Sequence, residues 1–199
     1  SSASGDDSIS IGTNSTANGT QGIGLGFNAT AGYKATAIGT YAAATAPYGV
    51  ALGDSSNAAA ISATALGSHA VAQQQATAVG QASTASGTLS TAIGFGSKAT
   101  GLASNALGYL SSASGSYSSA LGFNTNASGI SSNAFGTDAR ASGNNSSAVG
   151  TLAKASGLAS LAVGNYTVAN NEYSVAVGFN DQATGIAASA FGVDAVASG

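Results

Sequence analysis

The stretch that decides the fold is residues 94–107, GFGSKATGLASNAL, because its fourteen-residue pattern repeats along the chain. The next three copies begin at Gly108, Gly122 and Gly136 and read GYLSSASGSYSSAL, GFNTNASGISSNAF and GTDARASGNNSSAV. Each copy opens on a glycine that follows alanine and one bulky apolar residue. We number the positions of every copy from this glycine, which is position 0.

The position-0 glycines recur over the whole chain. Eleven of their thirteen intervals are 14 residues long and two, 26–39 and 67–80, are 13. Such a short fixed period is typical of stacked, nearly identical turns of chain. We therefore predict one repetitive domain of about fourteen coils over residues 1–199, a fragment of a longer protein. The glycines are Gly12, Gly26, Gly39, Gly53, Gly67, Gly80, Gly94, Gly108, Gly122, Gly136, Gly150, Gly164, Gly178 and Gly192.

The composition fits such coils better than a globular core. Leu, Ile, Val and Phe make up only 35 of 199 residues, and most of the 44% hydrophobic content is alanine. A low content of bulky apolar residues indicates disorder only together with a high net charge. The net charge here is only -3, so disorder is not indicated. The absence of cysteine argues against a disulfide scaffold, and the sequence pI near 4.5 argues against a nucleic-acid surface.

Two glycines divide each copy into two short runs. The second glycine usually lies seven residues after the first, which leaves runs of about five residues that suit strands rather than helices. Glycine at a corner favours positive φ, and Asn171, which replaces one second glycine, is compatible with the same conformation. Ala46, Ala60 and Gln74 replace others, so we expect a different turn geometry within residues 46–75.

Alternate residues of a strand face opposite ways, and here the two faces differ sharply in size. Positions minus 4 and minus 2 are nearly always Ser, Ala or Gly, and position plus 5 is alanine in all fourteen copies. Two runs joined by tight corners make a narrow coil, and only such small residues fit inside it. We expect successive coils to stack, with parallel pairing of equivalent runs. The bulky residue at position minus 1 must then point outward and form an apolar stripe. The stripe is Ile11, Leu25, Ile38, Leu52, Leu66, Val79, Ile93, Leu107, Leu121, Phe135, Val149, Val163, Val177 and Phe191.

An exposed stripe of this length would be an aggregation liability. Burying fourteen such side chains contributes at most on the order of 20 to 40 kcal/mol per chain, before the costs of association and ordering. A coil interior filled with alanine buries too little apolar surface to give a comparable stabilisation. We therefore expect a chain that is stable only as an oligomer, with the stripes meeting at a central axis.

Four stretches carry a resemblance to a known family: STAIGFGSKATG (90–101), SSALGFNTNASG (118–129), SSAVGTLAKASG (146–157) and SVAVGFNDQATG (174–185). They resemble the head repeats of trimeric autotransporter adhesins of the Yersinia adhesin type. The resemblance implies a left-handed parallel β-roll, a parallel homotrimer, and a stalk and outer-membrane anchor on a Gram-negative cell surface, the anchor lying outside this fragment. It places the axial position on Ile93, Leu107 and Leu121, and interior positions on Ala92, Ser97 and Ala99.

The residues give little sign of chemistry. His69 is the only histidine, and we expect it to be solvated rather than a metal ligand or a catalytic base. The stretch GLGFNATAG (24–32) superficially resembles a phosphate loop but lacks a following helix. We expect no enzymatic activity, no cofactor and no metal.

Function is then expected on the outer faces. Lys98, Arg140 and Lys154 share position plus 4 and, on neighbouring coils, would form basic ridges for acidic matrix or sugar polymers, unless Arg140 simply pairs with Asp138. Recurring aromatic residues at fixed corners favour packing between chains over ligand stacking. Four further residues at position plus 2 are candidates for exposed contacts: Tyr41, Leu110, Leu152 and Tyr166.

The sequence thus predicts a non-enzymatic adhesin head, a rigid trimeric rod that binds host matrix proteins such as collagen, fibronectin or laminin, or surface glycans, by repeated weak contacts. It predicts no nucleic-acid partner. The alternative is an ice-binding or other surface-ordering solenoid. That function needs an exposed threonine ladder, and the ladder Thr36, Thr64, Thr77 and Thr91 is interrupted at Val50 and shares a face with the stripe. A polysaccharide-processing β-helix enzyme ranks third, because the acids are scattered.

Overall fold

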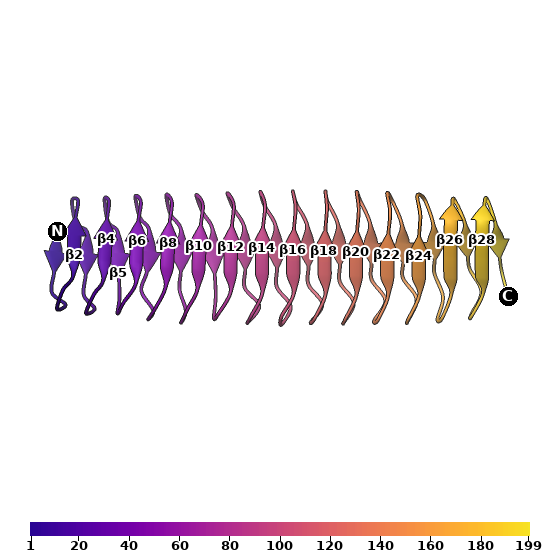
Figure 1. The fold of residues 1–199 in the computed structure, drawn as a ribbon, viewed down its shortest axis with the longest axis horizontal. Helices are drawn as coiled ribbons and strands as arrows, with labels where there is room; N and C mark the ends of the chain where they lie inside the picture. The colour runs from indigo at the N-terminus through magenta and orange to yellow at the C-terminus, as the bar shows by residue number, and fades with distance from the viewer. The chain divides into compact units, whose positions relative to one another are not determined.

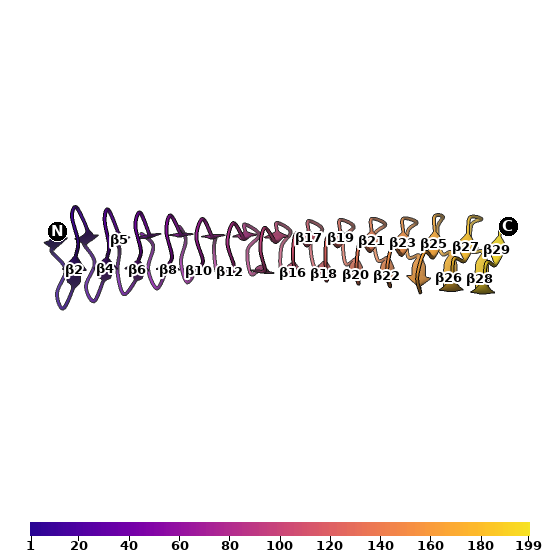
Figure 2. The ribbon, with the colours of Figure 1, turned by 90° about the horizontal axis from the view of Figure 1, so that it is seen from above.

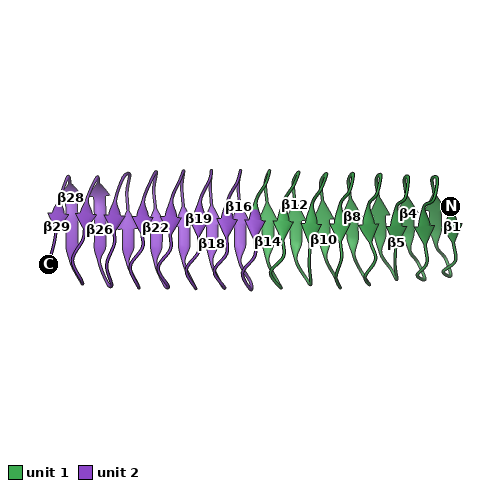
Figure 3. Cartoon of the chain, turned by 180° about the vertical axis from the view of Figure 1, so that it is seen from behind, with its two compact units in different colours: residues 1–97 green, residues 98–199 purple.

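The computed structural model describes residues 1–199 and consists of two units, Ser1–Ser97 and Lys98–Gly199 (Figure 3). Both units are all-β, with 29 short strands and no helix. The chain runs through about fourteen coils, each with one three-residue and one two-residue strand in most cases (Figure 1). The predicted parallel β-solenoid with two short strands per coil is confirmed. No helix of the length and apolarity required of a transmembrane segment occurs.

In the N-terminal unit the even-numbered strands form one parallel sheet and the odd-numbered strands a second. The first sheet contains β2 (Ile9–Ile11), β4 (Ile23–Leu25), β6 (Thr36–Ile38), β8 (Val50–Leu52), β10 (Thr64–Leu66), β12 (Thr77–Val79) and β14 (Thr91–Ile93). The second contains β1 (Ser2–Ala3), β3 (Thr16–Ala17), β5 (Thr30–Ala31), β7 (Ala43–Ala44), β9 (Asn57–Ala58), β11 (Val71–Ala72) and β13 (Thr84–Ala85).

The C-terminal unit repeats this arrangement, and Figure 2 shows its even-numbered and odd-numbered strands as two separate layers. The even-numbered sheet contains β16 (Asn105–Leu107), β18 (Ser119–Leu121), β20 (Asn133–Phe135), β22 (Ser147–Val149), β24 (Leu161–Val163), β26 (Val175–Phe179) and β28 (Ser189–Val193). The odd-numbered sheet contains β15 (Lys98–Ala99), β17 (Ser112–Ala113), β19 (Asn126–Ala127), β21 (Arg140–Ala141), β23 (Lys154–Ala155), β25 (Val168–Ala169), β27 (Gln182–Ala183) and β29 (Val196–Ala197).

Equivalent residues of successive coils are paired in register. Leu107 lies beside Leu121 in the even-numbered sheet, and Ala113 beside Ala127 in the odd-numbered sheet. The 13-residue coils keep this register, since Ala31 pairs with Ala44. Their missing residue comes from the corner between the odd-numbered strand and the next even-numbered one, which we call the second corner. The first corner is the other one, which begins at position 0.

The coil interior is narrow and filled with small side chains, as predicted. Ala99, Ala106 and Ala113 are fully buried, and so is Ser104. Ser104 Oγ donates a hydrogen bond to the carbonyl oxygen of Gly101 at 2.8 Å. The other buried serines make the same bond to the carbonyl three residues earlier, which offsets the cost of burying the hydroxyl, except Ser90, whose Oγ has no partner.

The corners depend on left-handed residues that are mostly not glycine. Positions plus 2 and minus 5 have φ between 49° and 62° in every coil, for example 53° at Asn124 and 59° at Tyr173. Their N–H groups donate to carbonyls of the preceding coil: Asn124 to Tyr109 at 2.8 Å, and Tyr173 to Leu158 at 2.8 Å. The hydrogen-bond ladder therefore continues around each corner, between the two sheets.

The expectation of positive φ at the second glycine, and at Asn171, is wrong. Of these positions only the terminal Gly199 has positive φ, and the left-handed residue lies two residues further on, at Tyr173 in the coil of Asn171. Glycine is needed there for another reason. A Cβ at Gly115 would overlap the carbonyl oxygen of Gly129 in the next coil. Position 0 carries both constraints, because Gly122 has φ of 134° and its Cβ would overlap the carbonyl oxygen of Gly136.

The expected difference in turn geometry within residues 46–75 is also largely wrong. Tyr48 and Ser62 adopt the usual left-handed conformation, with φ of 61° and 56°. Ser62 donates the usual inter-coil hydrogen bond, here to the carbonyl of Pro47 at 3.0 Å. Only the second corner of the coil 67–80 differs, because it is one residue shorter. Backbone spacing between coils, rather than residue type, sets the corner geometry.

Substitution by alanine should destabilise the protein more at position 0 than at the second glycine, position plus 7. Gly122→Ala adds a Cβ at φ of 134° as well as a backbone overlap, whereas Gly115→Ala adds only the overlap. Ala46 and Ala60 already occupy positions equivalent to Gly115. We expect Gly122→Ala to destabilise the protein by at least about 2 kcal/mol and by clearly more than Gly115→Ala. Thermal unfolding of both variants measures this, and equal losses in Tm would contradict the assignment of roles.

Candidate functional site

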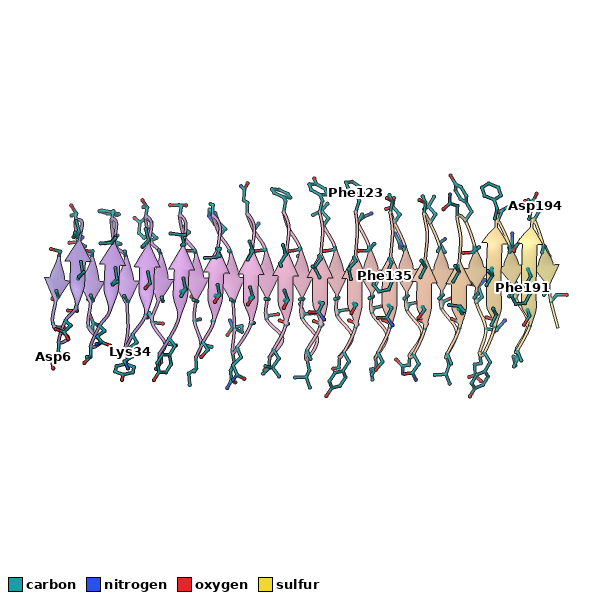
Figure 4. All side chains as sticks on the ribbon, in the orientation of Figure 1. Asp6, Lys34, Phe123, Phe135, Phe191 and Asp194 are labelled. Atoms are coloured by element: carbon teal, nitrogen blue, oxygen red, sulfur yellow. The ribbon has the colours of Figure 1, made fainter.

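The apolar stripe lies on the outer side of the even-numbered sheet in both units. Each of its fourteen residues is the third residue of an even-numbered strand. None is buried: six are exposed, among them Leu52 at 45% and Leu121 at 38%, and eight are half-buried. Figure 4 shows Phe135 and Phe191 over the strands of the C-terminal unit rather than at its corners. Their place at a trimer axis stays a prediction.

A more polar column runs beside the stripe. In the C-terminal unit Asn105, Ser119, Asn133 and Ser147 occupy position minus 3, pair in register, and are half-buried. In the N-terminal unit Thr64, Thr77 and Thr91 form the same column. The even-numbered sheet thus presents one apolar and one mostly polar column to its surroundings.

The basic residues lie on the opposite sheet. Lys98, Arg140 and Lys154 are exposed on the outer face of odd-numbered strands of the C-terminal unit. Arg140 and Lys154 are partners in the parallel ladder and so lie on neighbouring coils, as expected. Lys98 is three coils away from Arg140, so the expectation of neighbouring coils does not hold for Lys98. Asp138 accepts a hydrogen bond from Asn124 Nδ2 instead of pairing with Arg140.

The four candidate contact residues at position plus 2 are exposed at the first corner, in left-handed conformation. Their φ values are 55° at Tyr41, 53° at Leu110, 59° at Leu152 and 62° at Tyr166. Asn, Asp and Gly adopt this conformation readily, whereas Leu and Tyr do so at a cost. Several equivalent positions carry the favourable types: Asn14, Asn28, Gly96, Asn124, Asp138, Asn180 and Asp194. The bulky residues are therefore placed against the local conformational preference.

The corner aromatic residues contact one another within the chain. The rings of Tyr109 and Phe123 are stacked, with centroids 5.1 Å apart, and those of Tyr166 and Phe179 meet edge to face at 5.9 Å. In the N-terminal unit Phe27 contacts Tyr41 in the same way at 5.4 Å. Figure 4 shows Phe123 at a corner of its unit. These rings therefore pack between successive coils of one chain, and their packing between chains stays a prediction.

The structure also identifies a residue whose role the sequence did not reveal. Asp181 is fully buried at position plus 3, where other coils have a small side chain. Its Oδ1 accepts a hydrogen bond from the N–H of Ala195 in the next coil at 2.8 Å, and its Oδ2 has no partner. The break in the small-residue pattern was the available signal. Asp181 therefore connects two coils through its side chain.

His69 is exposed, as expected, and its Nδ1 lies 2.8 Å from Ser68 Oγ. No group of three or more His, Cys, Asp or Glu side chains comes together at any point of the chain. Neither unit contains a pocket. The candidate functional surfaces are therefore the outer faces of the two sheets and the corners.

A reciprocal exchange tests the conformational cost at the first corner. Leu152→Asn should raise the free energy of unfolding by roughly 0.5 to 1 kcal/mol, because asparagine tolerates the left-handed conformation. Asn124→Leu, at the equivalent position, should lower it by more than this, because it also removes the hydrogen bond from Asn124 Nδ2 to Asp138. Chemical denaturation of the two variants measures both changes. If Leu152→Asn destabilises the protein, leucine contributes packing that outweighs its backbone cost.

Comparison with known proteins agrees with this architecture. The family model described as the YadA head domain repeat matches residues 3–29, 31–56, 44–70, 72–97, 85–104, 99–125, 127–153 and 155–180. No curated protein sequence matches the chain. The family matches cover nearly the whole chain, and their starting points are a whole number of coils apart. The chain therefore belongs to the YadA head domain repeats, the head domains of trimeric autotransporter adhesins.

Proposed function

We propose that this chain is the head of an adhesin that assembles as a parallel homotrimer and binds host extracellular-matrix or cell-surface molecules. The membership in the head-repeat family supports an adhesin role. The observation that carries the proposal is the apolar stripe, fourteen bulky residues on one outer face with none of them buried in the single chain.

The stripe fits a central axis better than it fits solvent. Its side chains project from one sheet at equivalent positions of successive coils, so a second and third copy can contact every coil in the same way. Burial of each side chain contributes roughly 1.5 to 3 kcal/mol when complete. The half-buried polar column at position minus 3 would flank the axis and limit alternative registers, since its Asn and Ser side chains need hydrogen-bond partners.

Such an assembly leaves the odd-numbered sheet outermost. That sheet lies on the far side of the coil from the stripe and carries Lys98, Arg140 and Lys154, all exposed. Tyr41, Leu110, Leu152 and Tyr166 lie at the first corner, at the border of that sheet. Contacts made by these residues would repeat in each of three chains, and linked weak contacts add up to tight binding. Collagen, fibronectin, laminin and surface glycans are the ligand classes we propose.

The family is one of surface-exposed autotransporters, and we propose the same location for this protein, on the outer surface of a Gram-negative bacterium. Anchoring would come from segments beyond residues 1–199. The rival function, ice binding, draws on the threonine column formed by Thr64, Thr77 and Thr91. That column lies beside the stripe on the same sheet, so trimerisation at the stripe would cover it.

Assembly is tested by mass in solution with a matched pair of variants. The unsubstituted protein should have the mass of a trimer. Leu107→Asp with Leu121→Asp should abolish the trimer, because it places adjacent charges in the stripe. The control Ser112→Asp with Asn126→Asp adds the same two charges on adjacent coils of the odd-numbered sheet and should remain trimeric. A well-folded monomer for the unsubstituted protein, or a trimeric Leu107→Asp/Leu121→Asp variant, would refute the axial assignment.

Adhesion is tested on immobilised collagens, fibronectin, laminin and glycans. The trimer should bind at least one of them and dissociate at least about tenfold more slowly than any single-chain variant that keeps its fold, because three equivalent faces act together. Surface-based binding kinetics at low and high ligand density separate avidity from affinity. Thermal hysteresis in the absence of matrix or glycan binding would favour the ice-binding alternative instead.

A further inference from the structure

We propose that the outer face of the odd-numbered sheet in the C-terminal unit binds an anionic polysaccharide that lies along the stack of coils. This inference rests on the proposed function and names the ligand class of one face. The basic face is defined by Lys98, Ser112, Asn126, Arg140 and Lys154, the outward residues of β15, β17, β19, β21 and β23.

The charge of this face is opposite to that of the whole chain. The chain has a net charge of -3, yet three of its four Lys and Arg residues lie on this one face. The outward positions of its strands carry no carboxylate. The unit has four acids. Asp181 is buried inside the coil, and Asp138 and Asp194 are at the first corner, where each accepts a hydrogen bond from an asparagine amide. Glu172 is exposed at the second corner, after β25, and is not an outward residue of a strand.

The cations are arranged in a line. Arg140 and Lys154 are direct partners in the parallel ladder, so their Cα atoms lie about 4.8 Å apart. Lys98 lies on the same column three coils away, at about 14 Å from Arg140. Ser112 and Asn126 fill the column between them. A flexible linear anion running along the coils meets all three charges, whereas a small anion meets two.

A second column supplies hydroxyl groups beside the charges. Ser128, Ser142 and Ser156 follow the strands at position plus 6 and are exposed. Their backbone N–H groups are used between coils, as in the bond from Ser128 to the carbonyl of Ala141 at 2.9 Å, so the side chains are held at regular intervals. Ser156 Oγ also donates to Asn170 Oδ1 at 3.0 Å. The face therefore combines charges with aligned hydroxyl and amide groups.

This combination favours a glycan over an acidic protein. Protein interfaces are usually anchored by aromatic or large apolar side chains that fill a pocket. On this column the only apolar outward residue in the neighbourhood is Val168, which follows Lys154. Sugar hydroxyls instead match the serine and asparagine groups. Arg140 can hold a sulfate or carboxylate through two parallel hydrogen bonds, and Lys154 adds a point charge.

The test uses purified protein of residues 1–199 and a heparin dodecasaccharide as the probe, with titration calorimetry at about 50 and 300 mM NaCl. We expect binding that weakens with salt, because exposed charges are screened. Arg140→Gln with Lys154→Gln should weaken binding by at least about tenfold, since each charge-assisted hydrogen bond contributes appreciably. Lys34→Gln, which removes the remaining cation from a corner of the N-terminal unit, is the matched control and should bind as the unsubstituted protein does.

The outcomes separate the alternatives. All three cations are exposed, so the variants should keep their fold and trimer mass, which circular dichroism and light scattering verify. Equal binding by Arg140→Gln/Lys154→Gln and the unsubstituted protein overturns the inference, and so does binding of poly-glutamate but not of heparin. Binding of neutral dextran at the same strength also overturns it. If the protein adheres to matrix proteins but ignores heparin, this inference fails while the adhesin role stands.

Discussion

The close approach of backbone to backbone in successive coils is the constraint on which the rest of this structure depends. Within each unit, successive coils are hydrogen-bonded through both sheets and through both corners, as with Asn124 and Tyr109 or Tyr173 and Leu158. At this spacing a side chain at position 0 would overlap the next coil, and the interior holds mainly alanine and serine, with Thr125, Thr167 and Asp181 as its largest side chains. Residue size inside the coil follows directly from coil stacking.

That constraint also decides where the apolar residues go. Alanine buries little apolar surface, so the interior contributes little hydrophobic stabilisation compared with a globular core. Leu, Ile, Val and Phe cannot fit inside and must project outward, where they are at best half-buried in the single chain. The protein thus has its apolar stripe on the outside of one sheet and three of its four basic residues on the outside of the other. The narrow coil interior thus explains why the bulky apolar residues lie on an outer face.

The periodicity of the sequence was sufficient for the coils, the strands, the interior residues and the face of each outward residue. It was not sufficient for the backbone at the corners. Glycine at position plus 7 suggests positive φ, but it marks the close approach of two coils. The left-handed residue of that corner is at position minus 5, as at Tyr173, and that of the first corner is at position plus 2, as at Leu152. Neither tyrosine nor leucine is a sequence signal for this conformation. By contrast, the separation of Lys98 from Arg140 by three coils follows from the sequence alone, because 42 residues are three periods of 14.

Leu110, Leu152, Tyr41 and Tyr166 show where folding alone does not explain the sequence. A left-handed corner position is best filled by asparagine, aspartate or glycine, and the chain uses these at equivalent corners such as Asn124 and Asp194. Leucine and tyrosine add a conformational cost and also expose apolar surface. Tyr41 and Tyr166 recover part of this cost through ring contacts with Phe27 and Phe179. Residues whose conformational cost is not fully offset inside the fold are expected where another molecule makes contact. The first corner borders the outer face of the odd-numbered sheet, so the proposed binding surface combines its bulky residues with the basic face.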